Sequence, residues 1–280
     1  MMEKLDTGTN ELLCEIEDRV ATVTLNKPLK KNALGDVLTP ALRETLLRLE
    51  GHSSVGCVMI TGTGNAFCSG GDIGGMGNRK GGEASGQSAP KSQHERVTEL
   101  TRKQETLTLR LFELAKPTIA ALPGAAAGAG LSIALACDIR IASESAFVTT
   151  AFANIGLSGD YGASWFLPQI VGLARAKEMF FTADRISANE GLDMGLINKV
   201  FPDNSFRADA FEYARKIANG PTMALGLMKK NLNSGLNQGL AASLAMEAEH
   251  LIMSGGSAES SEAIKAFMEK RTPRFHTNDE

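Results

Sequence analysis

The chain has 280 residues, of which 43% are hydrophobic, so it can build one large domain or a domain with an appendage. Lysine and arginine total 29 against 32 aspartates and glutamates, which gives a net charge of −3. This balance argues against a broad contact with nucleic acid or with an anionic membrane. The longest mostly apolar run, residues 118–136, is interrupted by Pro123 and by glycines and is a poor membrane span.

Targeting and redox signals favour a cytoplasmic protein. The N-terminal sequence MMEKLDTGTN lacks the apolar core of a secretion signal. The four cysteines lie far apart and none forms a CxxC pair, which favours reduced, mostly packed thiols. The four histidines are equally scattered, so we expect no metal site.

The expected elements alternate between strands and helices through the first half of the chain. Residues 11–26 alternate apolar and polar side chains on both sides of Glu-Asp-Arg and predict a hairpin, and leucines recur at helical spacing over 34–49. The next expected elements are, in chain order, a strand at 55–61, an amphipathic helix at 97–114, a strand at 118–122, a small-residue helix at 129–137, and strands at 139–142 and 146–149. One side of the amphipathic helix is expected to carry Val97, Leu100, Gln104, Leu107, Leu111 and Leu114. Beyond Tyr161 the pattern is helical except for a strand at 198–201.

This order of elements predicts an α/β layer fold, with a core over 1–200 and a helical region over 201–280. Residues 77–93 are rich in glycine and serine and contain no large apolar side chain, which is typical of a flexible loop. Because this segment follows a glycine-rich turn, a lid and a slack linker are both open interpretations. No repeat is regular enough to indicate a solenoid.

Two of the strands run into glycine-rich turns, GTGNAFCSGGD and PGAAAGAGLS. Glycine serves where the backbone takes a positive φ or approaches another group closely. A turn that enters a helix also leaves free N–H groups at the positive end of the helix dipole, where negative charge can be held. The first turn lacks the Lys-Ser/Thr of a P-loop, and the second has Ile133 in place of the third glycine of a dinucleotide fingerprint. The turns can instead hold the oxyanion of a thioester enolate.

The segment AFCSGGDI, followed further along the chain by LPGAAAGAGLSIALACDIRIAS, resembles the paired oxyanion-hole segments of the crotonase superfamily, the enoyl-CoA hydratases and isomerases. LNKPLKKNAL resembles the CoA-contacting segment of that family, ADRISANEGLDMGLINKVF its helix–strand passage, and AFMEKRTPRF its C-terminal tail. The resemblance implies a crotonase-like spiral of ββα units with C-terminal helices that form a homotrimer or a dimer of trimers. It also implies an acyl-CoA thioester substrate, with CoA as part of that substrate and no separate cofactor.

The same resemblance implies which residues form the site. The oxyanion donors would be the N–H groups of Gly71 and Ala129. The residues expected to contact the substrate are Lys27, Lys30, Ile73, Gly128, Phe152, Tyr161, Phe267 and Lys270. Lys27 and Lys30, together with Lys31, form a local basic cluster that suits the phosphates of CoA, with a solvated loop as the alternative interpretation.

The type of reaction depends on which carboxylates are present. Hydratases of the family carry two glutamates, and the matching positions here hold Ser132 and Phe152, neither of which can act as a carboxylate base. Asp160 matches the catalytic aspartate of a branch that contains enoyl-CoA and epoxyphenylacetyl-CoA isomerases. Moving a double bond takes a proton from one carbon and returns it to another, so one carboxylate can perform both steps. For Asp72, beside the first oxyanion donor, we expect a structural capping role.

The sequence leaves alternatives for Asp160 and for the reaction. Gly-Asp-Tyr-Gly is also good turn chemistry, because aspartate readily bonds its own backbone. Four nearby aromatic side chains can either wall an apolar pocket or pack as ordinary core: Phe152, Tyr161, Trp165 and Phe166. The leading prediction is an acyl-CoA isomerase in which Asp160 carries the proton. The alternatives are a hydratase that uses Asp160 and a water held by backbone or by Ser132, and a non-catalytic binding protein of the same fold.

Overall fold

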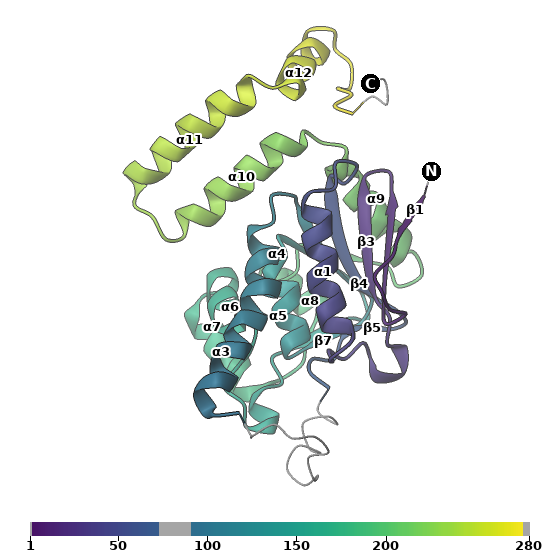
Figure 1. Ribbon diagram of the computed structural model, residues 1–280, viewed down its shortest axis with the longest axis vertical. Coiled ribbons are helices and arrows are strands. Elements are labelled where there is room, and N and C mark those ends of the chain that lie inside the picture. Colours follow the sequence, from purple (N-terminus) through teal and green to yellow (C-terminus); the bar gives the residue numbers. More distant parts are fainter. Residues whose placement is uncertain (1, 73–90, 277–280) are drawn as a thin grey trace.

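The computed structural model describes residues 2–72 and 91–276, and its larger sheet has seven strands in the order β1-β2-β3-β4-β6-β8-β11 (Figure 1). These strands are β1 Glu3–Leu5, β2 Leu12–Glu17, β3 Val20–Leu25, β4 Cys57–Gly62, β6 Thr118–Leu122, β8 Ile139–Ser143 and β11 Lys199–Phe201. The first three are antiparallel and the run from β3 to β11 is parallel. The predicted hairpin is confirmed as β2 and β3, and four other predicted strands are confirmed as β4, β6, β8 and β11.

A smaller sheet has four short strands in the order β10-β9-β7-β5. These are β10 Ile186–Ser187, β9 Phe147–Thr149, β7 Ala125–Ala127 and β5 Ala66–Cys68. Strands β5 and β7 lie inside the two glycine-rich segments, which the sequence pattern had shown only as turns. A main-sheet strand is therefore followed by a strand of the smaller sheet before the chain enters a helix, and the ββα spiral is confirmed.

The helices begin and end close to where local sequence signals place them. Their bounds are α1 Leu38–Glu50, α3 Gln93–Gln104, α4 Arg110–Glu113, α5 Ala129–Ala136, α6 Ala163–Val171, α7 Leu173–Thr182, α8 Ala188–Asp193, α9 Phe206–Ala218, α10 Thr222–Gly235, α11 Leu240–Gly255 and α12 Ala258–Met268, with the short 3₁₀ turns η1 Pro28–Lys30 and η4 Ala153–Ile155. Pro40 is accommodated in the first turn of α1, where N–H groups have no intrahelical acceptor. Ser92 and Glu95 form a capping box, so α3 begins four residues before the predicted start.

The helix predicted over 97–114 is interrupted by a π-helical turn, η3, at Glu105–Leu109. Its predicted apolar side is only partly buried. Leu107 and Leu111 are fully buried, whereas Val97 and Leu100 are exposed. A π turn inserts an extra residue into the helical repeat and so changes which side chains face the core. The buried leucines therefore lie within the π turn and after it, whereas the residues before the turn present a different face of the helix.

The hydrophobic core has two parts, one on each face of the main sheet. The larger part lies between that sheet and the helices α1, α5 and α6, and the smaller part is covered by α9. Alternate side chains of β4 point to the two faces, so Cys57 contacts the α9 side while Val58 contacts the other. All six residues of β4 are buried, as expected for a parallel strand with both faces covered. Helix α9 thus shares a core with the preceding ββα units.

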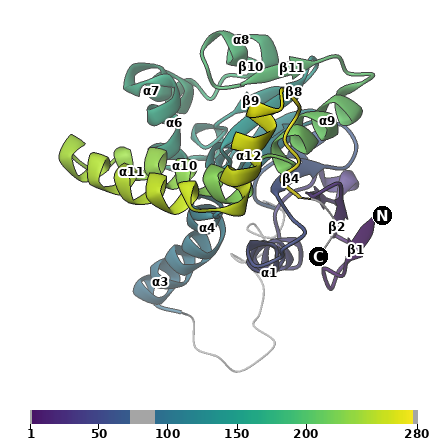
Figure 2. The same cartoon turned by 90° about the horizontal axis from the view of Figure 1, so that it is seen from above.

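The last three helices extend away from this body. Helices α10 and α11 form an antiparallel pair, and α12 stands at the opposite end of the molecule from β5 and β7 (Figures 1 and 2). Their outward surfaces are apolar, with Ile252 78% exposed and Phe267 82% exposed. Exposed apolar patches of this kind usually mark contact surfaces.

Three expectations about special chemistry can be compared with the described ranges. No helix in them is long and apolar enough to cross a membrane. Residues 2–72 and 91–276 contain no group of three or more His, Cys, Asp or Glu side chains placed to hold a metal ion. The packed thiols are confirmed, because all four cysteines are buried and unpaired. Burial raises the pKa of Cys68 to about 12, so this thiol is an unreactive part of the core.

Candidate active site

The two glycine-rich segments meet where β5 and β7 pair in parallel. A Cβ atom built on Gly70 would lie 3.0 Å from the Ala127 carbonyl oxygen and 3.6 Å from the Ala129 amide nitrogen. A Cβ atom on Gly130 would lie 2.4 Å from the Cys68 carbonyl oxygen, which is closer than real Cβ contacts allow. The glycines are therefore needed for this close approach, which brings the two predicted oxyanion donors to the same place.

The N–H groups of Gly71 and Ala129 lie at positions where the local backbone bonds do not use them. Leu34 pairs with Gly71 through bonds that involve the carbonyl oxygen of Gly70 and the N–H of Asp72, at 2.8 and 2.9 Å. The Gly71 N–H takes no part in this bridge. Ala129 is the first residue of α5, where an N–H has no intrahelical acceptor and the helix dipole is positive. Gly128 precedes it at φ +51°, a conformation that suits glycine.

A cavity of about 320 Å³ opens beside these amides. The residues that line it include Gly71, Ala129, Asp160 and Tyr161. Three of the predicted catalytic groups, from segments far apart in the sequence, therefore lie around one space. Most of its remaining wall comes from the start of α1 and the segment before it and from α3, and the rest from three charged residues. The remaining lining residues are Glu11, Lys27, Leu34, Gly35, Asp36, Val37, Thr39, Pro40, Arg43, Asp72, Leu100 and Lys103.

Asp160 lies in the loop before α6, on one side of this cavity. Its Oδ1 accepts hydrogen bonds from the Gln104 Nε2 at 2.7 Å and from the Tyr161 N–H at 2.8 Å. Its backbone carbonyl accepts a bond from the Ser132 hydroxyl at 2.8 Å. Burial raises the pKa of the Asp160 carboxyl, and the two hydrogen bonds to Oδ1 only partly oppose this effect. A carboxylate with a raised pKa in a cleft is a candidate for proton transfer.

Another part of the cavity wall is charged and is formed by Glu11, Lys27 and Asp72. Asp72 lies 2.7 Å from the Lys30 ammonium and 3.6 Å from the Lys27 ammonium, and Lys27 also lies 3.8 Å from Glu11. The hydrogen bond and charge of Lys30 hold the pKa of Asp72 below its usual range. Asp72 therefore holds the lysine cluster in place as an ion-pair partner. The backbone that it was expected to cap lies outside the described residues.

The two residues at the hydratase positions have other contacts. Ser132 is fully buried in α5, and its hydroxyl contacts the carbonyls of Asp160 and Gly128, at 2.8 and 3.2 Å. Phe152 is buried and stacks on Phe180 with ring centroids 6.0 Å apart. Its ring also lies 3.8 Å from the position of a Cβ on Gly128, beside the second oxyanion turn. Neither residue supplies a carboxylate to the cavity.

The other aromatic residues divide between pocket and core. Tyr161 lines the cavity, and its hydroxyl accepts a bond from Arg43 Nη2 at 3.1 Å. Trp165 and Phe166 pack against Phe112 with ring centroids 5.3 and 5.5 Å away. Tyr161 therefore belongs to the site wall, whereas Trp165 and Phe166 hold α6 against the end of the α3–α4 run.

The remaining predicted contacts are not gathered at this cavity within one chain. Phe267 is on α12 and Lys270 just beyond it, at the end of the molecule away from β5 and β7 (Figure 1). Both are exposed. Ile73, and most of the 77–93 segment that was expected to be a loop, lie outside the described residues. These assignments stay predictions.

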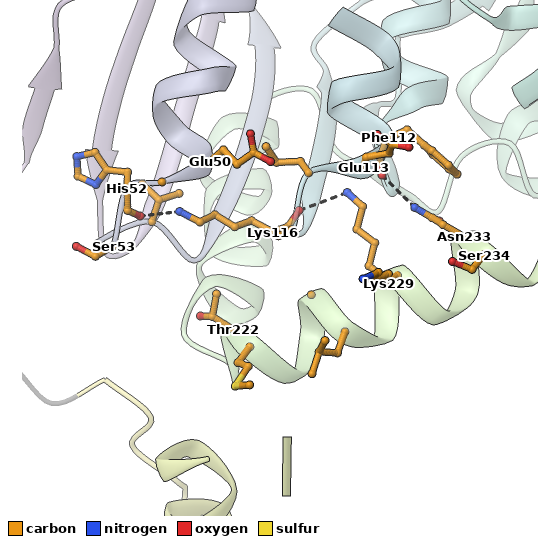
Figure 3. A pocket seen from close by; sticks show the side chains of 18 of the residues that line it. Glu50, His52, Ser53, Phe112, Glu113, Lys116, Thr222, Lys229, Asn233 and Ser234 are labelled. Carbon is orange, nitrogen blue, oxygen red and sulfur yellow. Dashed lines mark hydrogen bonds between the residues drawn. The ribbon is translucent and has the colours of Figure 1, made fainter. Parts of the chain in front are cut away.

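A larger cavity of about 1000 Å³ lies between the body and α10 (Figure 3). Within it the Lys116 ammonium donates to the carbonyls of Leu49 and His52, and the Lys229 ammonium lies 2.9 Å from the Asp138 carboxylate. Burial lowers the pKa of Lys116 to about 8. The Lys229 ion pair attaches α10 to the body, whereas the Lys116 bonds lie within the body. None of the predicted site residues within the described ranges lines this cavity, so we assign the site to the smaller one.

Two residues that contact the Asp160 loop were not identified from sequence. Gln104 bonds the carboxylate itself, and Arg43 bonds Tyr161. The sequence pattern had placed Gln104 among the apolar residues of the predicted helix. A single amide on an otherwise apolar side was the available signal, because a buried amide needs a hydrogen-bond partner. Arg43 carried no comparable signal, since a surface helix normally contains arginines.

The ββα spiral and the two converging glycine-rich segments define a crotonase-type α/β protein. The family model described as enoyl-CoA hydratase/isomerase matches residues 15–278. A "Probable enoyl-CoA hydratase" of Rhodobacter capsulatus is 39% identical and covers 93% of this chain and 96% of its own length. The 1,2-epoxyphenylacetyl-CoA isomerase of Escherichia coli K12 is 35% identical and covers 94% and 97%.

Solved structures agree with this assignment. The crystal structure of an enoyl-CoA hydratase from Polaromonas sp. JS666 superposes with a TM-score of 0.85 at 31% identity, over 94% of this chain and 98% of that one. The similarity covers the C-terminal helices as well as the ββα units. The chain belongs to the enoyl-CoA hydratase/isomerase family.

Proposed function

We propose that the protein is an acyl-CoA isomerase that moves a double bond, or rearranges a ring epoxide, in an enoyl-CoA thioester. One observation carries the proposal: Asp160 shares a cavity with the amides of Gly71 and Ala129. Ser132 and Phe152, which the family resemblance matches to the hydratase glutamates, supply no carboxylate there. The likeness to a 1,2-epoxyphenylacetyl-CoA isomerase supports the same choice.

The proposed reaction needs one carboxylate and one oxyanion hole. The thioester carbonyl oxygen accepts hydrogen bonds from the Gly71 and Ala129 N–H groups. Asp160 removes a proton from the carbon next to the carbonyl, and the electron pair moves into a dienolate whose negative charge rests on that oxygen. The protonated Asp160 then returns the proton to the far carbon of the allylic system. The double bond has moved, no water is consumed, and Asp160 is again ionised.

Burial of Asp160 suits this role. A carboxylate in water has a pKa near 4 and is a weak base, whereas burial raises the pKa of Asp160 and so strengthens its ionised form as a proton acceptor. Phosphate groups of CoA would contact Lys27, which lines the cavity, and Lys30, which pairs with the lining residue Asp72. The Lys30 side chain is more than half exposed, so its ammonium can bind an anion while it remains close to Asp72.

Hydration is the second candidate function, because the relatives include proteins with hydratase names. In that reaction Asp160 would activate a water for addition to a 2-enoyl-CoA. Ser132 is poorly placed to hold such a water, since its hydroxyl is fully buried and donates to the Asp160 carbonyl. Water would have to be held by backbone groups.

The test is to incubate purified protein with a 3-enoyl-CoA and to follow the absorbance of the conjugated 2-enoyl-CoA. We expect that absorbance to rise, and we expect little loss of absorbance from crotonyl-CoA, which reports hydration. Absence of turnover on 3-enoyl-CoA and on a ring-epoxide thioester, with intact acyl-CoA binding, would overturn the isomerase proposal. Rapid crotonyl-CoA hydration that requires Asp160 would support the hydratase instead.

We also propose that the chain self-associates through α10–α12, as a homotrimer or a dimer of trimers. The exposed apolar side chains of these helices support this, and association would allow Phe267 and Lys270 to reach CoA bound to a neighbouring subunit. Light scattering of the wild type should give a multiple of the 29.7 kDa chain mass. Ile252→Glu, which places a charge in the apolar surface, should reduce that mass, and a monomeric wild type would contradict the proposal.

A further inference from the structure

The two carboxylate oxygens of Asp160 have different surroundings. Oδ1 accepts bonds from the Gln104 amide at 2.7 Å and from the Tyr161 N–H at 2.8 Å. Among residues 2–72 and 91–276, no hydrogen bond reaches Oδ2. We propose that Gln104 is a positioning residue, which anchors Oδ1 so that Oδ2 is the oxygen that carries the proton. This inference rests on the proposed function of Asp160 as the proton carrier.

Gln104 is itself held in a defined place. It is the last residue of α3, directly before the π-helical turn, and its carbonyl accepts a bond from the Thr108 hydroxyl at 3.2 Å. The preceding residue, Lys103, accepts a bond from Arg43 Nε at 3.1 Å, which ties this end of α3 to α1. Single π turns inside helices are frequent at functional sites. Here the turn coincides with the point where the helix supplies an amide to the carboxylate.

The backbone of Asp160 is held from another direction. The Ser132 hydroxyl, on α5, donates to the Asp160 carbonyl at 2.8 Å, and α5 also carries the Ala129 amide at its first residue. Side chain and backbone of Asp160 are thus anchored by two different helices. Ser132 belongs to the helix that begins at the Ala129 amide, so its bond fixes the position of the Asp160 loop relative to the proposed oxyanion donor. Gln104 then fixes the rotation of the Asp160 carboxylate.

A neutral amide is a suitable anchor for this carboxylate. It stabilises the ionised form through a hydrogen bond without adding a positive charge that would make Asp160 a weak base. The charged and titratable groups around the cavity come from several elements: Arg43 and Asp36 from the α1 side, Lys103 from α3, Tyr161 beside Asp160, and Lys27, Asp72 and Glu11 from other segments. Asp72, Lys27 and Glu11 contact one another, and Arg43 contacts Tyr161. Gln104 is the side chain that bonds the Asp160 carboxylate directly.

The experiment compares Gln104→Met with Gln93→Met, the same substitution at the exposed first residue of the same helix. Gln104→Met removes a hydrogen bond to a charged group, so we expect its kcat to fall by roughly 10- to 100-fold. Because the lost bond stabilised the ionised form, the acidic limb of the kcat/KM profile should move to higher pH. KM should change much less than kcat. Gln93→Met should match the wild type in all three quantities.

Gln104→Glu is the second variant, since it keeps the shape of the side chain and replaces the donor by a carboxylate. Two carboxylates that share a site raise the pKa of one of them, so the acidic limb should move further upward than in Gln104→Met. A titration of the Asp160 carboxyl by ¹³C NMR reports the same shift without turnover. The inference is overturned if both Gln104 variants keep the kcat and the acidic limb of Gln93→Met.

Asp160→Asn separates this inference from the function on which it rests. If Asp160→Asn keeps wild-type turnover, Asp160 is not the proton carrier and the proposed mechanism fails. If Asp160→Asn is inactive while the Gln104 variants behave as wild type, only the positioning role fails. If Asp160→Asn is inactive and the Gln104 variants show the lower kcat and the raised limb, both are supported.

Discussion

Two aspartates line the same cavity, and their surroundings differ in kind. Asp72 lies between the ammonium groups of Lys30 and Lys27, which hold its pKa down. The two groups that donate hydrogen bonds to the Asp160 carboxylate are neutral, and burial raises the pKa of Asp160. Neighbouring carboxylates whose pKa values are pushed apart usually have separate tasks. Asp72 suits a role in substrate binding, and Asp160 suits a role in proton transfer.

The strongest test of this comparison is to remove each charge in turn. Asp160→Asn should lower kcat by about 10²- to 10⁴-fold, the usual contribution of a general acid–base group. Asp72→Asn should change kcat by less than about threefold, since surface ion pairs contribute little, and should act mainly on the KM for acyl-CoA. Steady-state kinetics on a 3-enoyl-CoA measure both. Equal losses of kcat in the two variants would remove the distinction.

The oxyanion turns can be disturbed without touching either aspartate. Gly130→Ala would place a Cβ atom 2.4 Å from the Cys68 carbonyl oxygen, so the two segments must move apart. We expect kcat to fall by about 10²-fold, comparable with the loss of one oxyanion donor. Gly51→Ala is the control, because its Cβ would meet no atom within 4 Å. Circular dichroism and thermal melting show whether the fold survives, and unchanged kcat in folded Gly130→Ala would exclude this site for the oxyanion.

The pH profile distinguishes the aspartates by direction. Asp160 accepts a proton only when it is ionised, so kcat/KM should fall as the pH drops through its pKa. Because burial raises that pKa, the acidic limb should lie above the ordinary aspartate value of about 3.9. Asp72→Asn should leave the limb in place. If the acidic limb disappears in Asp72→Asn, the limb reports the titration of Asp72, and our assignment of it to Asp160 is wrong.

The smallest expected effect concerns the lysine cluster. Lys30→Met should raise the KM for acyl-CoA by about two- to fivefold and leave kcat unchanged, since an exposed charge is screened by solvent. The difference from the wild type should shrink as salt is added. Lys91→Met, outside the cavity, provides the matched control. If Lys30→Met lowers kcat by the same factor at every salt concentration, Lys30 takes part in the reaction itself.

Much of the fold follows from local patterns. Alternation predicts the β2–β3 hairpin, apolar runs predict the central parallel strands, and leucine spacing predicts α1. The glycine-rich segments were identified as places where the backbone approaches another group closely, and the contacts at Gly70 and Gly130 confirm this. Their role as oxyanion turns stays a prediction. Strands β5 and β7 were missed because each has only three residues and lies inside a glycine-rich segment, a composition typical of turns.

The choice of Asp160 was also reached from sequence, through the absence of carboxylates at positions 132 and 152. Its partners were not. Gln104 lies on a different helix, and the π turn that follows it has no sequence signature that could be read in advance. Likewise nothing local shows that Ser132 bonds the Asp160 carbonyl rather than holding water.

The division between these two kinds of knowledge has a physical basis. The local sequence determines which segments form strands, helices and glycine turns, because these depend on backbone sterics. It also determines which positions carry a carboxylate, because that is a property of the side chain alone. Distances across the cavity depend on how β5, β7, α3 and α5 pack against one another. That packing alone places an amide on one oxygen of Asp160, separates this carboxylate from the lysines that hold Asp72, and so gives two aspartates opposite pKa shifts.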